Sequence, residues 1–200
     1  MKLYCATTNP GKLREFRLAV ERFGGGIEIE TLPGLEGIEP PEEHGETFEE
    51  NAIAKAVYYS RYAPGPLFAD DSGLEVDALG GAPGVRSARY AGAGATDEQN
   101  NRLLLERMCG VKDRTARFVC VVALAEKGRL LGTFRGTVEG RLLEAPRGAN
   151  GFGYDPLFYY PPFQRTLAEV SGEEKLSVSH RGKAIEAMLR WLAAGRARAG

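Results

Sequence analysis

A short run near the N-terminus has the composition and position of an anion-binding turn. Thr7-Thr8-Asn9-Pro10-Gly11-Lys12 lies between a predicted strand and a predicted helix. The first backbone N–H groups of a helix are free to bind an anion, and the helix macrodipole favours negative charge there. Lys12 adds a positive charge to the first turn, which a phosphate would balance. The alternative is a simple turn with an exposed lysine, because the spacing of a P-loop is missing.

A second lysine lies on the apolar face of the helix predicted from Thr47 to about Tyr62. At about 100 degrees per residue, Lys55 falls close to Phe48, with Asn51 beside it one turn earlier. Burying an ammonium group is costly unless a negative charge pairs with it. The pattern favours a lysine that reaches an anion in a cleft. The alternative is a lysine that extends to solvent or pairs with a nearby carboxylate.

Two adjacent aspartates follow a brief predicted strand, in the run Asp70-Asp71-Ser72-Gly73. Consecutive strand residues point to opposite faces, so one of the two aspartates is expected to enter a given cleft. Mg2+ is bound by one or two carboxylates plus substrate phosphates, and a nearby carboxylate can take a proton from an attacking water. Glu42 or Glu43, in the proline-rich loop of residues 33–46, is a candidate second carboxylate. The alternatives are an Asx-turn and a solvated acidic loop.

Two further segments carry side chains suited to a nucleotide. The run Gly151-Phe152-Gly153-Tyr154-Asp155-Pro156 places two aromatic rings on a glycine-flanked loop, where they could stack on a base or a sugar. Ser179-His180-Arg181-Gly182, with Lys175 upstream, offers donors to a carbonyl oxygen or a phosphate. Core aromatics and a helix cap with surface charges are the alternatives. Three basic anchors, an acidic pair and an aromatic loop together match the needs of a magnesium-bound nucleotide.

The elements that would position these residues alternate between strands and helices in the first half of the chain. Strands are predicted at Lys2–Thr7, Ile27–Leu32, Leu67–Ala69, Leu74–Leu79, Phe118–Ala125, Leu130–Val138 and Leu157–Tyr160. Helices are predicted after Gly11, from Thr47, from Thr96 to about Gly110, and through Ile185, Met188, Leu189 and Leu192. Capping pairs are predicted at Thr47–Glu50, Thr96–Gln99 and Thr166–Glu169. This order predicts one α/β domain over residues 1–200, with a mixed sheet rather than a bundle or a sandwich.

Composition and charge exclude several classes of protein. The 200 residues carry 26 basic and 27 acidic side chains, a net charge of −1, which argues against a protein that grips a nucleic-acid backbone. Three widely spaced cysteines and two histidines argue against a disulfide framework and a zinc site. The sequence shows neither a signal peptide nor an apolar run of membrane-spanning length, so a cytoplasmic location without membrane attachment is expected.

The chain resembles the inosine triphosphate pyrophosphatase family, also called HAM1-like or non-canonical purine NTP pyrophosphatases. The matching segments occur in family order and together are highly specific. They are Ala6 to Lys12, Thr47 to Ala52 with Lys55-Ala56, Ala69 to Gly92, Gly151 to Phe158, Glu174-Lys175, and Ser179 to Ala184.

The resemblance implies an α/β fold with an elongated mixed β-sheet flanked by helices, two lobes around a central nucleotide-binding cleft, and a homodimer. It implies Mg2+-dependent hydrolysis of ITP, dITP and XTP to the monophosphate and pyrophosphate, which would cleanse the nucleotide pool of deaminated purines. Asp71 would act as general base and metal ligand, with Asp70 beside it and Glu42 favoured over Glu43 as a further ligand. The implied substrate-binding residues are Thr7, Thr8, Asn9, Pro10, Gly11, Lys12, Lys55, Ser72, Phe152, Gly153, Tyr154, Asp155, Lys175, His180 and Arg181.

Two other functions compete with this interpretation. One is a Maf-like pyrophosphatase for pyrimidine nucleotides, against which the His180-Arg181 segment and the aromatic loop argue. The other is a non-catalytic nucleotide sensor or RNA-binding module, which would not need Asp71. Donors from His180 or Arg181 would meet the 6-oxo group of hypoxanthine or xanthine, whereas the 6-amino group of adenine would leave them unpaired. Guanine also carries a 6-oxo group, so its exclusion needs a further feature.

Overall fold

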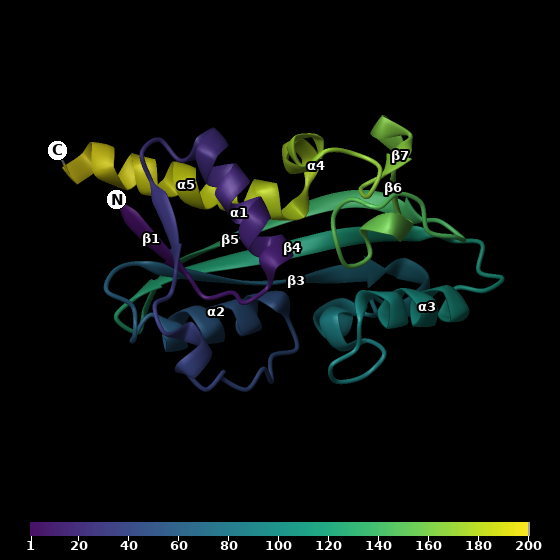
Figure 1. The fold of residues 1–200 in the computed structure, drawn as a ribbon, viewed down its shortest axis with the longest axis horizontal. Coiled ribbons are helices and arrows are strands. Elements are labelled where there is room, and N and C mark those ends of the chain that lie inside the picture. The colour runs from purple at the N-terminus through teal and green to yellow at the C-terminus, as the bar shows by residue number, and fades with distance from the viewer. Residues whose placement is uncertain (200) are drawn as a thin grey trace.

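The centre of the protein is a seven-stranded mixed sheet with the strand order β2-β1-β3-β4-β5-β6-β7 (Figure 1). A computed structural model describes residues 1–199, with the side chains of residues 1–195, so Gly200 of the predicted domain lies outside the described residues. β1 pairs in parallel with β2 and β3, and the later strands pair antiparallel. The predicted α/β class and mixed sheet are confirmed.

The described elements follow the predicted order along the chain. The strands are β1 (Lys2–Cys5), β2 (Glu28–Thr31), β3 (Leu67–Val76), β4 (Thr115–Glu126), β5 (Arg129–Leu142), β6 (Phe158–Tyr160) and β7 (Arg165–Thr166). The helices are α1 (Pro10–Phe23), α2 (Phe48–Tyr59), α3 (Asp97–Arg107), α4 (Gly172–Val178) and α5 (His180–Ala199). Short 3-10 helices include Asp77–Leu79, Gly84–Arg89 and Asp155–Leu157.

Helices cover both faces of the three long antiparallel strands β3, β4 and β5. α1, α4 and α5 lie on one face, and α2 and α3 lie on the other (Figure 1). On β4, Cys120, Val122 and Leu124 pack with α1 and α5, and the odd-numbered apolar residues between them pack with α2. The same alternation on β3 places Asp70 and Asp71 on opposite faces of the sheet.

β3 is one continuous strand, so the predicted strand end at Asp70 was wrong. All ten of its residues pair with β4 in an unbroken antiparallel ladder. This ladder holds the polar Asp-Asp-Ser-Gly run extended, and tertiary pairing therefore overrides the turn preference of its residues. Gly73 is needed within the strand because a Cβ there would lie 2.4 Å from the Oγ of Ser87, in the 3-10 helix Gly84–Arg89.

One edge of β3 is covered by β1 over only part of its length. The pairing of β1 with β3 ends at Cys5 opposite Phe68, and the chain then turns into α1. The Phe68 carbonyl accepts from the Ala6 N–H at 3.1 Å, and further along the same edge the Leu74 N–H donates to the Oγ of Ser87 at 2.9 Å. Between these two contacts the edge of β3 is open, because it pairs with no other strand of the described residues there.

The predicted helix starts are close to the observed ones, but two caps differ. Thr96–Gln99 forms a complete capping box. Thr47 caps α2 by accepting from the Glu50 N–H, but the Glu50 carboxylate accepts from another N–H, so this box is half formed. Thr166–Glu169 closes a turn beside β7, and the helix that follows begins with the capping box Ser171–Glu174.

Apolar side chains form separate clusters toward the two ends of the sheet. One cluster joins β1, α1 and α5, and another joins the far ends of β3, β4 and β5 with α3 and β6.

Within residues 1–199, the helices are all too short or too polar to cross a membrane.

Candidate active site

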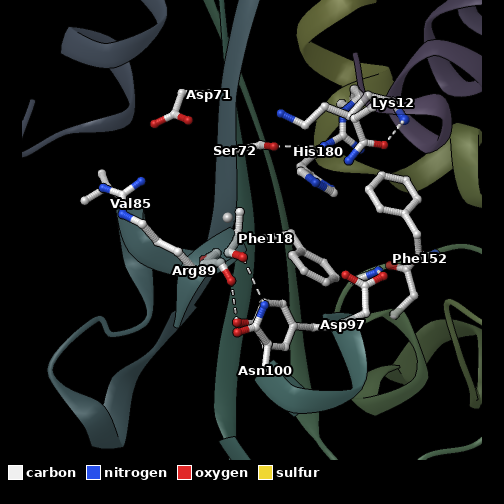
Figure 2. Close-up of a pocket in the computed structure, with 18 of the residues that line it drawn as sticks. Lys12, Asp71, Ser72, Val85, Arg89, Asp97, Asn100, Phe118, Phe152 and His180 are labelled. Carbon is white, nitrogen blue, oxygen red and sulfur yellow. Dashed lines mark hydrogen bonds between the residues drawn. The ribbon is translucent and has the colours of Figure 1, made fainter. Parts of the chain in front are cut away.

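A pocket of about 230 Å³ lies along the open edge of β3 and takes side chains from both faces of the sheet. Asp71 and Ser72 point to opposite sides of the strand (Figure 2). Lys55 and Glu43 line the pocket together with Asp71, and Arg181 lines it together with Ser72. The open strand edge therefore joins two chemically different groups of side chains in one site.

Asp71 is held by two donors from α2. The Lys55 Nζ lies 3.3 Å from Asp71 Oδ1, and the Asn51 Nδ2 donates to Asp71 Oδ2 at 3.2 Å. Burial raises the pKa of Asp71, and the Lys55 charge opposes part of that rise. Asp71 is therefore a fixed carboxylate that is more basic than an exposed aspartate.

Glu43, rather than the favoured Glu42, is the glutamate that the structure brings to the pocket. Glu42 is exposed, and its Oε2 lies 2.5 Å from the Nε2 of the exposed His44. The Oε1 of Glu43 lies 3.0 Å from the same lysine that contacts Asp71. Two carboxylates share one ammonium group here, and such a set of hard oxygens suits Mg2+ when phosphates complete the shell. Among the described residues, no three His, Cys, Asp or Glu side chains gather as a metal cluster.

Asp70 lies outside the pocket, on the other face of β3, so the structure does not place it beside Asp71 as a metal ligand. The Lys12 Nζ donates to Asp70 Oδ2 at 2.9 Å, and the Arg181 Nε lies 3.9 Å from the same oxygen. Burial alone would raise the pKa of Asp70, but the charges of Lys12, Arg181 and Lys55, with the hydrogen bond from Lys12, outweigh it and lower the pKa to about 2. Asp70 thus neutralises two cations of the site.

The predicted phosphate-binding run divides between two hollows. Asn9 and Lys12 line the main pocket, whereas Thr7 and Thr8 line a second hollow beside β2. The Asn9 Oδ1 accepts from the Lys12 N–H at 3.1 Å and caps α1, and the Thr7 Oγ1 accepts from the Asn9 N–H at 3.2 Å. The structure therefore brings Asn9 and Lys12 of this run to the pocket, whereas Pro10 and Gly11 do not line it.

Phe152 lies between the start of α1 and two cations. Pro10 begins α1, and at the next residue, Gly11, a Cβ would lie 2.6 Å from the Phe152 Cδ1. The Lys175 Nζ lies 4.8 Å and the Arg181 Cζ 5.4 Å from the centroid of the Phe152 ring. The ring is thus fixed at the pocket wall, where it can serve as a stacking surface.

The residues after Phe152 attach the aromatic loop to the opposite wall of the pocket. The Gly153 N–H donates to Asp97 Oδ2 at 2.8 Å, and the Gly153 carbonyl accepts from the Asn101 Nδ2 at 2.9 Å. The Tyr154 hydroxyl donates to the Ser87 carbonyl at 2.6 Å. Gly153 and Tyr154 therefore fix the position of the ring before them.

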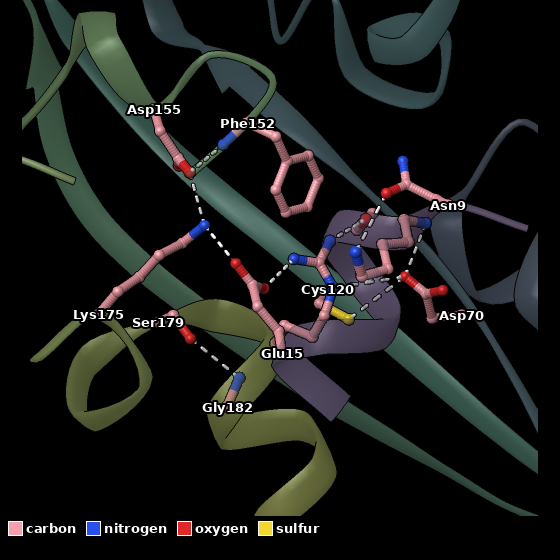
Figure 3. Close-up of polar contacts among 12 residues, drawn as sticks. Asn9, Glu15, Asp70, Cys120, Phe152, Asp155, Lys175, Ser179 and Gly182 are labelled. Atoms are coloured by element: carbon pink, nitrogen blue, oxygen red, sulfur yellow. Dashed lines mark hydrogen bonds and ion pairs between the residues drawn. The ribbon is translucent and has the colours of Figure 1, made fainter. Parts of the chain in front are cut away.

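A carboxylate that sequence reasoning missed, Glu15 of α1, joins the two cations beside Phe152 (Figure 3). The Lys175 Nζ contacts Glu15 Oε1 and donates to Asp155 Oδ2 at 2.6 Å. The Arg181 Nη1 donates to Glu15 Oε2 at 2.5 Å, and its Nη2 donates to the Ser72 Oγ at 2.9 Å. No sequence signal separates this glutamate from Glu21, the exposed glutamate of the same helix.

His180 and Arg181 each have a buried polar atom that makes no hydrogen bond. The His180 Nδ1 and the Arg181 Nε make no hydrogen bond to the described residues. The His180 ring stacks on Phe118, with centroids 4.8 Å apart and planes at 16°. Burial, followed by neighbouring cations, lowers the pKa of His180 well below its usual value, so the ring is neutral. Because buried polar atoms are rarely left unpaired, these two suit a polar ligand.

The sequence and the fold match proteins of one known family. A model of the Ham1 family matches residues 3–191. The chain belongs to this family. It is 50% identical over 198 residues to the dITP/XTP pyrophosphatase of Acidobacterium capsulatum, a match that covers 94% of this chain and 97% of that protein. It is 51% identical over 191 residues to the dITP/XTP pyrophosphatase of Thermus thermophilus, covering 94% and 90%. The solved structure of the Staphylococcus aureus Ham1 protein superposes with a TM-score of 0.85 at 38% identity, covering 98% of this chain and 100% of that one.

Several further pocket residues of this Ham1-family chain were not predicted, and three of them carry charged or aromatic side chains. These three are Arg89, Asp97 and Phe118 (Figure 2). Phe118 stands in an apolar strand, and Asp97 follows a helix cap, so each has an ordinary structural explanation in the sequence. Arg89 lies in the matching run, where nothing distinguishes it from Arg86 three residues earlier.

Proposed function

We propose that this Ham1-family protein hydrolyses dITP, XTP and ITP to the nucleoside monophosphate and pyrophosphate, and so removes deaminated purines from the nucleotide pool. The observation that carries the proposal is the open edge of β3. It places a basic carboxylate, Asp71, and two unpaired base-reading groups, on His180 and Arg181, in one pocket. The relative named a dITP/XTP pyrophosphatase at 50% identity supports the same reaction.

In this mechanism Asp71 takes a proton from water as the water oxygen bonds to the α-phosphorus. The bond between the α-phosphorus and the bridging oxygen breaks, and its electron pair leaves with pyrophosphate. Lys55 and Asn51 hold the Asp71 carboxylate in place, as their contacts of 3.3 Å and 3.2 Å indicate. Lys12 and Lys55 offset the negative charge that develops on the phosphates.

Asp71 and Glu43 are the residues that would hold Mg2+. When bound, the ion would supply positive charge beside the phosphates. This assignment is supported by the excess of negative charge at this end of the pocket, where two carboxylates contact a single lysine. This assignment replaces Glu42 and Asp70 of the sequence prediction by Glu43.

The other end of the pocket would select purines with a 6-oxo group. Phe152 would stack on the base, and the neutral His180, whose Nδ1 makes no hydrogen bond to the described residues, would donate to its oxygen beside Arg181. Adenine presents an amino group at that position, which would leave buried donors without partners. The protein would therefore select against ATP because adenine cannot accept a hydrogen bond from these buried donors.

The proposal also includes a homodimer in a reducing compartment such as the cytoplasm. Leu130 and Leu131 on the β4–β5 hairpin and Trp191 on α5 are exposed apolar side chains that could lie in an interface. The reducing compartment is proposed because three widely spaced cysteines, Cys5, Cys109 and Cys120, do not suggest a disulfide framework. Analytical ultracentrifugation of the purified protein tests the dimer.

The deciding experiment measures pyrophosphate and orthophosphate released from ITP, dITP, XTP, GTP, ATP and UTP, with Mg2+ and with EDTA. Rapid pyrophosphate release from the first three nucleotides, dependent on Mg2+, is the expected result. Release of orthophosphate would contradict the attack at the α-phosphorus. Preference for UTP would favour a Maf-like pyrimidine enzyme, and binding without turnover in Mg2+ would favour a nucleotide sensor.

A further inference from the structure

Five cationic side chains line the pocket of the Ham1-family site, and four of them already contact carboxylates. Lys12 pairs with Asp70, Lys55 with Glu43 and Asp71, Lys175 with Glu15 and Asp155, and Arg181 with Glu15. Arg89 differs, because its side chain makes neither an ion pair nor a hydrogen bond in the described part of the chain and the residue is exposed to solvent. Arg89 is therefore the cation of this pocket whose donors are free for a ligand.

The backbone that carries Arg89 is fixed, although its side chain is free. Arg89 is the last residue of the 3-10 helix Gly84–Arg89. Ser87 attaches this helix to the edge of β3, since its Oγ accepts from the Leu74 N–H at 2.9 Å and donates to the Gly84 carbonyl at 2.6 Å. The Asn100 Nδ2 donates to the Ala88 carbonyl at 3.1 Å. Ordered backbone next to an unpaired guanidinium is typical of a binding residue rather than of a mobile surface arginine.

Arg89 belongs to the same side of the sheet as Asp71. Val85 of its 3-10 helix packs against the apolar cluster that α2 forms with β3 and β4, and α2 also carries the lysine that contacts Asp71. Arg89 lies on the Val85 side of the pocket, across from Phe152 (Figure 2). The free guanidinium therefore lies nearer the wall that would hold phosphates than the wall that would read the base.

We propose that Arg89 binds the terminal phosphates of the substrate and the pyrophosphate that leaves, an inference that rests on the proposed function. A guanidinium presents five N–H donors in a planar fork that matches two phosphoryl oxygens. The leaving pyrophosphate gains negative charge as its bond to the α-phosphorus breaks, and a fixed cation beside it stabilises that charge. Lys12 and Lys55 cannot give their full charge to these oxygens, because carboxylates already share it.

Arg86 provides a matched control on the same 3-10 helix. It is exposed like Arg89, but it does not line the pocket. Arg86→Ala removes the same charge from the same element, so it reports any general effect of lost positive charge on anion binding. Because both side chains are exposed, neither substitution should disturb folding, and thermal unfolding checks this.

The experiment measures inhibition of ITP hydrolysis by pyrophosphate and by IMP in the wild type, Arg89→Ala, Arg89→Lys and Arg86→Ala. Arg89→Ala should weaken pyrophosphate inhibition by about 10- to 100-fold, the range for a hydrogen bond to a charged group, and leave IMP inhibition within about twofold. Arg89→Lys should fall between, and Arg86→Ala should match the wild type. Equal losses for pyrophosphate and IMP, or equal effects at Arg89 and Arg86, would overturn the proposal.

Calorimetric titration of the same proteins with pyrophosphate and Mg2+ separates this inference from the proposed function. If the wild type failed to split ITP but bound pyrophosphate in an Arg89-dependent way, the reaction would be wrong and the anion subsite right. If ITP were split normally and Arg89→Ala bound pyrophosphate as the wild type does, the reaction would stand and the role of Arg89 would be wrong.

Discussion

Asp70 and Asp71 are adjacent in the sequence, but the alternation of β3 gives them opposite electrostatic environments. Neighbouring cations lower the pKa of Asp70 to about 2, whereas burial raises the pKa of Asp71. A proton acceptor benefits from a raised pKa, and a carboxylate that balances buried cations must stay ionised. We therefore assign catalysis to Asp71 and stabilisation to Asp70.

Replacing Asp71 with asparagine should abolish turnover without unfolding the protein. Asparagine keeps the shape of the side chain but cannot take a proton from water. We expect kcat for ITP to fall by about 100-fold or more, with little change in Tm. Steady-state kinetics and calorimetry measure both, and near-normal turnover of Asp71→Asn would refute the assigned role.

The pH dependence of kcat/KM should report the ionisation of Asp71. Because burial raises its pKa, activity should fall with decreasing pH at a midpoint above the ordinary range of aspartate. The Lys55 charge lowers that pKa, so Lys55→Gln should move the acid limb to higher pH. Lys112→Gln, at an exposed lysine, is the control and should leave the midpoint unchanged. If the midpoint did not move in Lys55→Gln, the loss of activity at low pH would have to arise from the ionisation of another group.

Asp70→Asn should destabilise the fold, in contrast to Asp71→Asn. The variant leaves Lys12 and Arg181 without their shared carboxylate, and removing one partner of a buried ion pair costs about 3–5 kcal/mol. The folded-state pKa of Asp70 is lowered to about 2, so its contribution is complete above the unfolded pKa near ~3.9 and is lost as pH falls toward 2. Urea unfolding should show a difference from wild type at neutral pH that shrinks on acidification. A constant difference would contradict the ionic origin.

The sequence could indicate which residue types belong to the site, but not every position. Lys55 was correctly predicted to face a pocket, because the spacing of residues along α2 determines which face of the helix each one occupies. The loop before α2 has no such period, so the choice between Glu42 and Glu43 needed the structure. Glu15 pairs with residues about 160 positions away in the chain, and no local pattern encodes that contact.

At the scale of elements, the first turn of α3 holds the aromatic loop across the pocket. Asp97 and Asn101 lie one turn apart and bind the N–H and the carbonyl of Gly153, immediately after Phe152. Gly153 has a φ of +60°, which a non-glycine residue adopts less readily. The stacking surface of the pocket is therefore positioned by a helix from the opposite wall.

Asp97→Ala and Asn101→Ala should weaken substrate binding through Phe152. We expect KM for ITP to rise by about 3- to 10-fold in each, the range for one lost hydrogen bond, with smaller changes in kcat. Asp97→Asn keeps an acceptor for the Gly153 N–H and should recover most of the loss. Glu98→Gln, on the same turn but paired only with Arg102, is the control. A fall in kcat at constant KM would place the role of Asp97 in the chemical step instead.

β3 illustrates why local sequence patterns misjudge an element. The run of aspartate, serine and glycine favours a turn, and the apolar residues on either side were predicted as two strands. The unbroken pairing with β4 keeps all ten residues extended. By contrast, β4 itself was predicted correctly, because its apolar run of Phe118–Ala125 has no competing turn signal.

At the scale of the whole molecule, the two groups of site residues depend on how the helices dock on opposite faces of one sheet. α5 brings His180 and Arg181 to the pocket by packing closely on β5. At Gly136 of β5, a Cβ would lie 2.0 Å from the His180 carbonyl and 2.8 Å from the Ala184 backbone nitrogen. The glycine at position 136 thus allows the N-terminal end of α5, which carries His180 and Arg181, to lie close to the sheet.

Gly136→Ala should therefore separate the two ends of the pocket functionally. The added methyl group meets backbone atoms, so α5 must shift, at a cost of about 1–3 kcal/mol in stability for an overpacked site. Preference for ITP over ATP should fall, because His180 and Arg181 move. Pyrophosphate inhibition should stay close to wild type, because Asp71 and its lysine lie on the other face.

Gly132→Ala on the same strand is the matched control, since its Cβ would approach only the Phe134 ring, at 3.3 Å and 3.5 Å. It should keep wild-type stability and nucleotide preference. Kinetics with ITP and ATP, pyrophosphate inhibition and urea unfolding of both variants complete the comparison. The opposing outcome is that Gly136→Ala reduces pyrophosphate inhibition as strongly as it reduces the preference for ITP over ATP. That result would contradict the idea that the helices on each face of the sheet position their own end of the pocket independently.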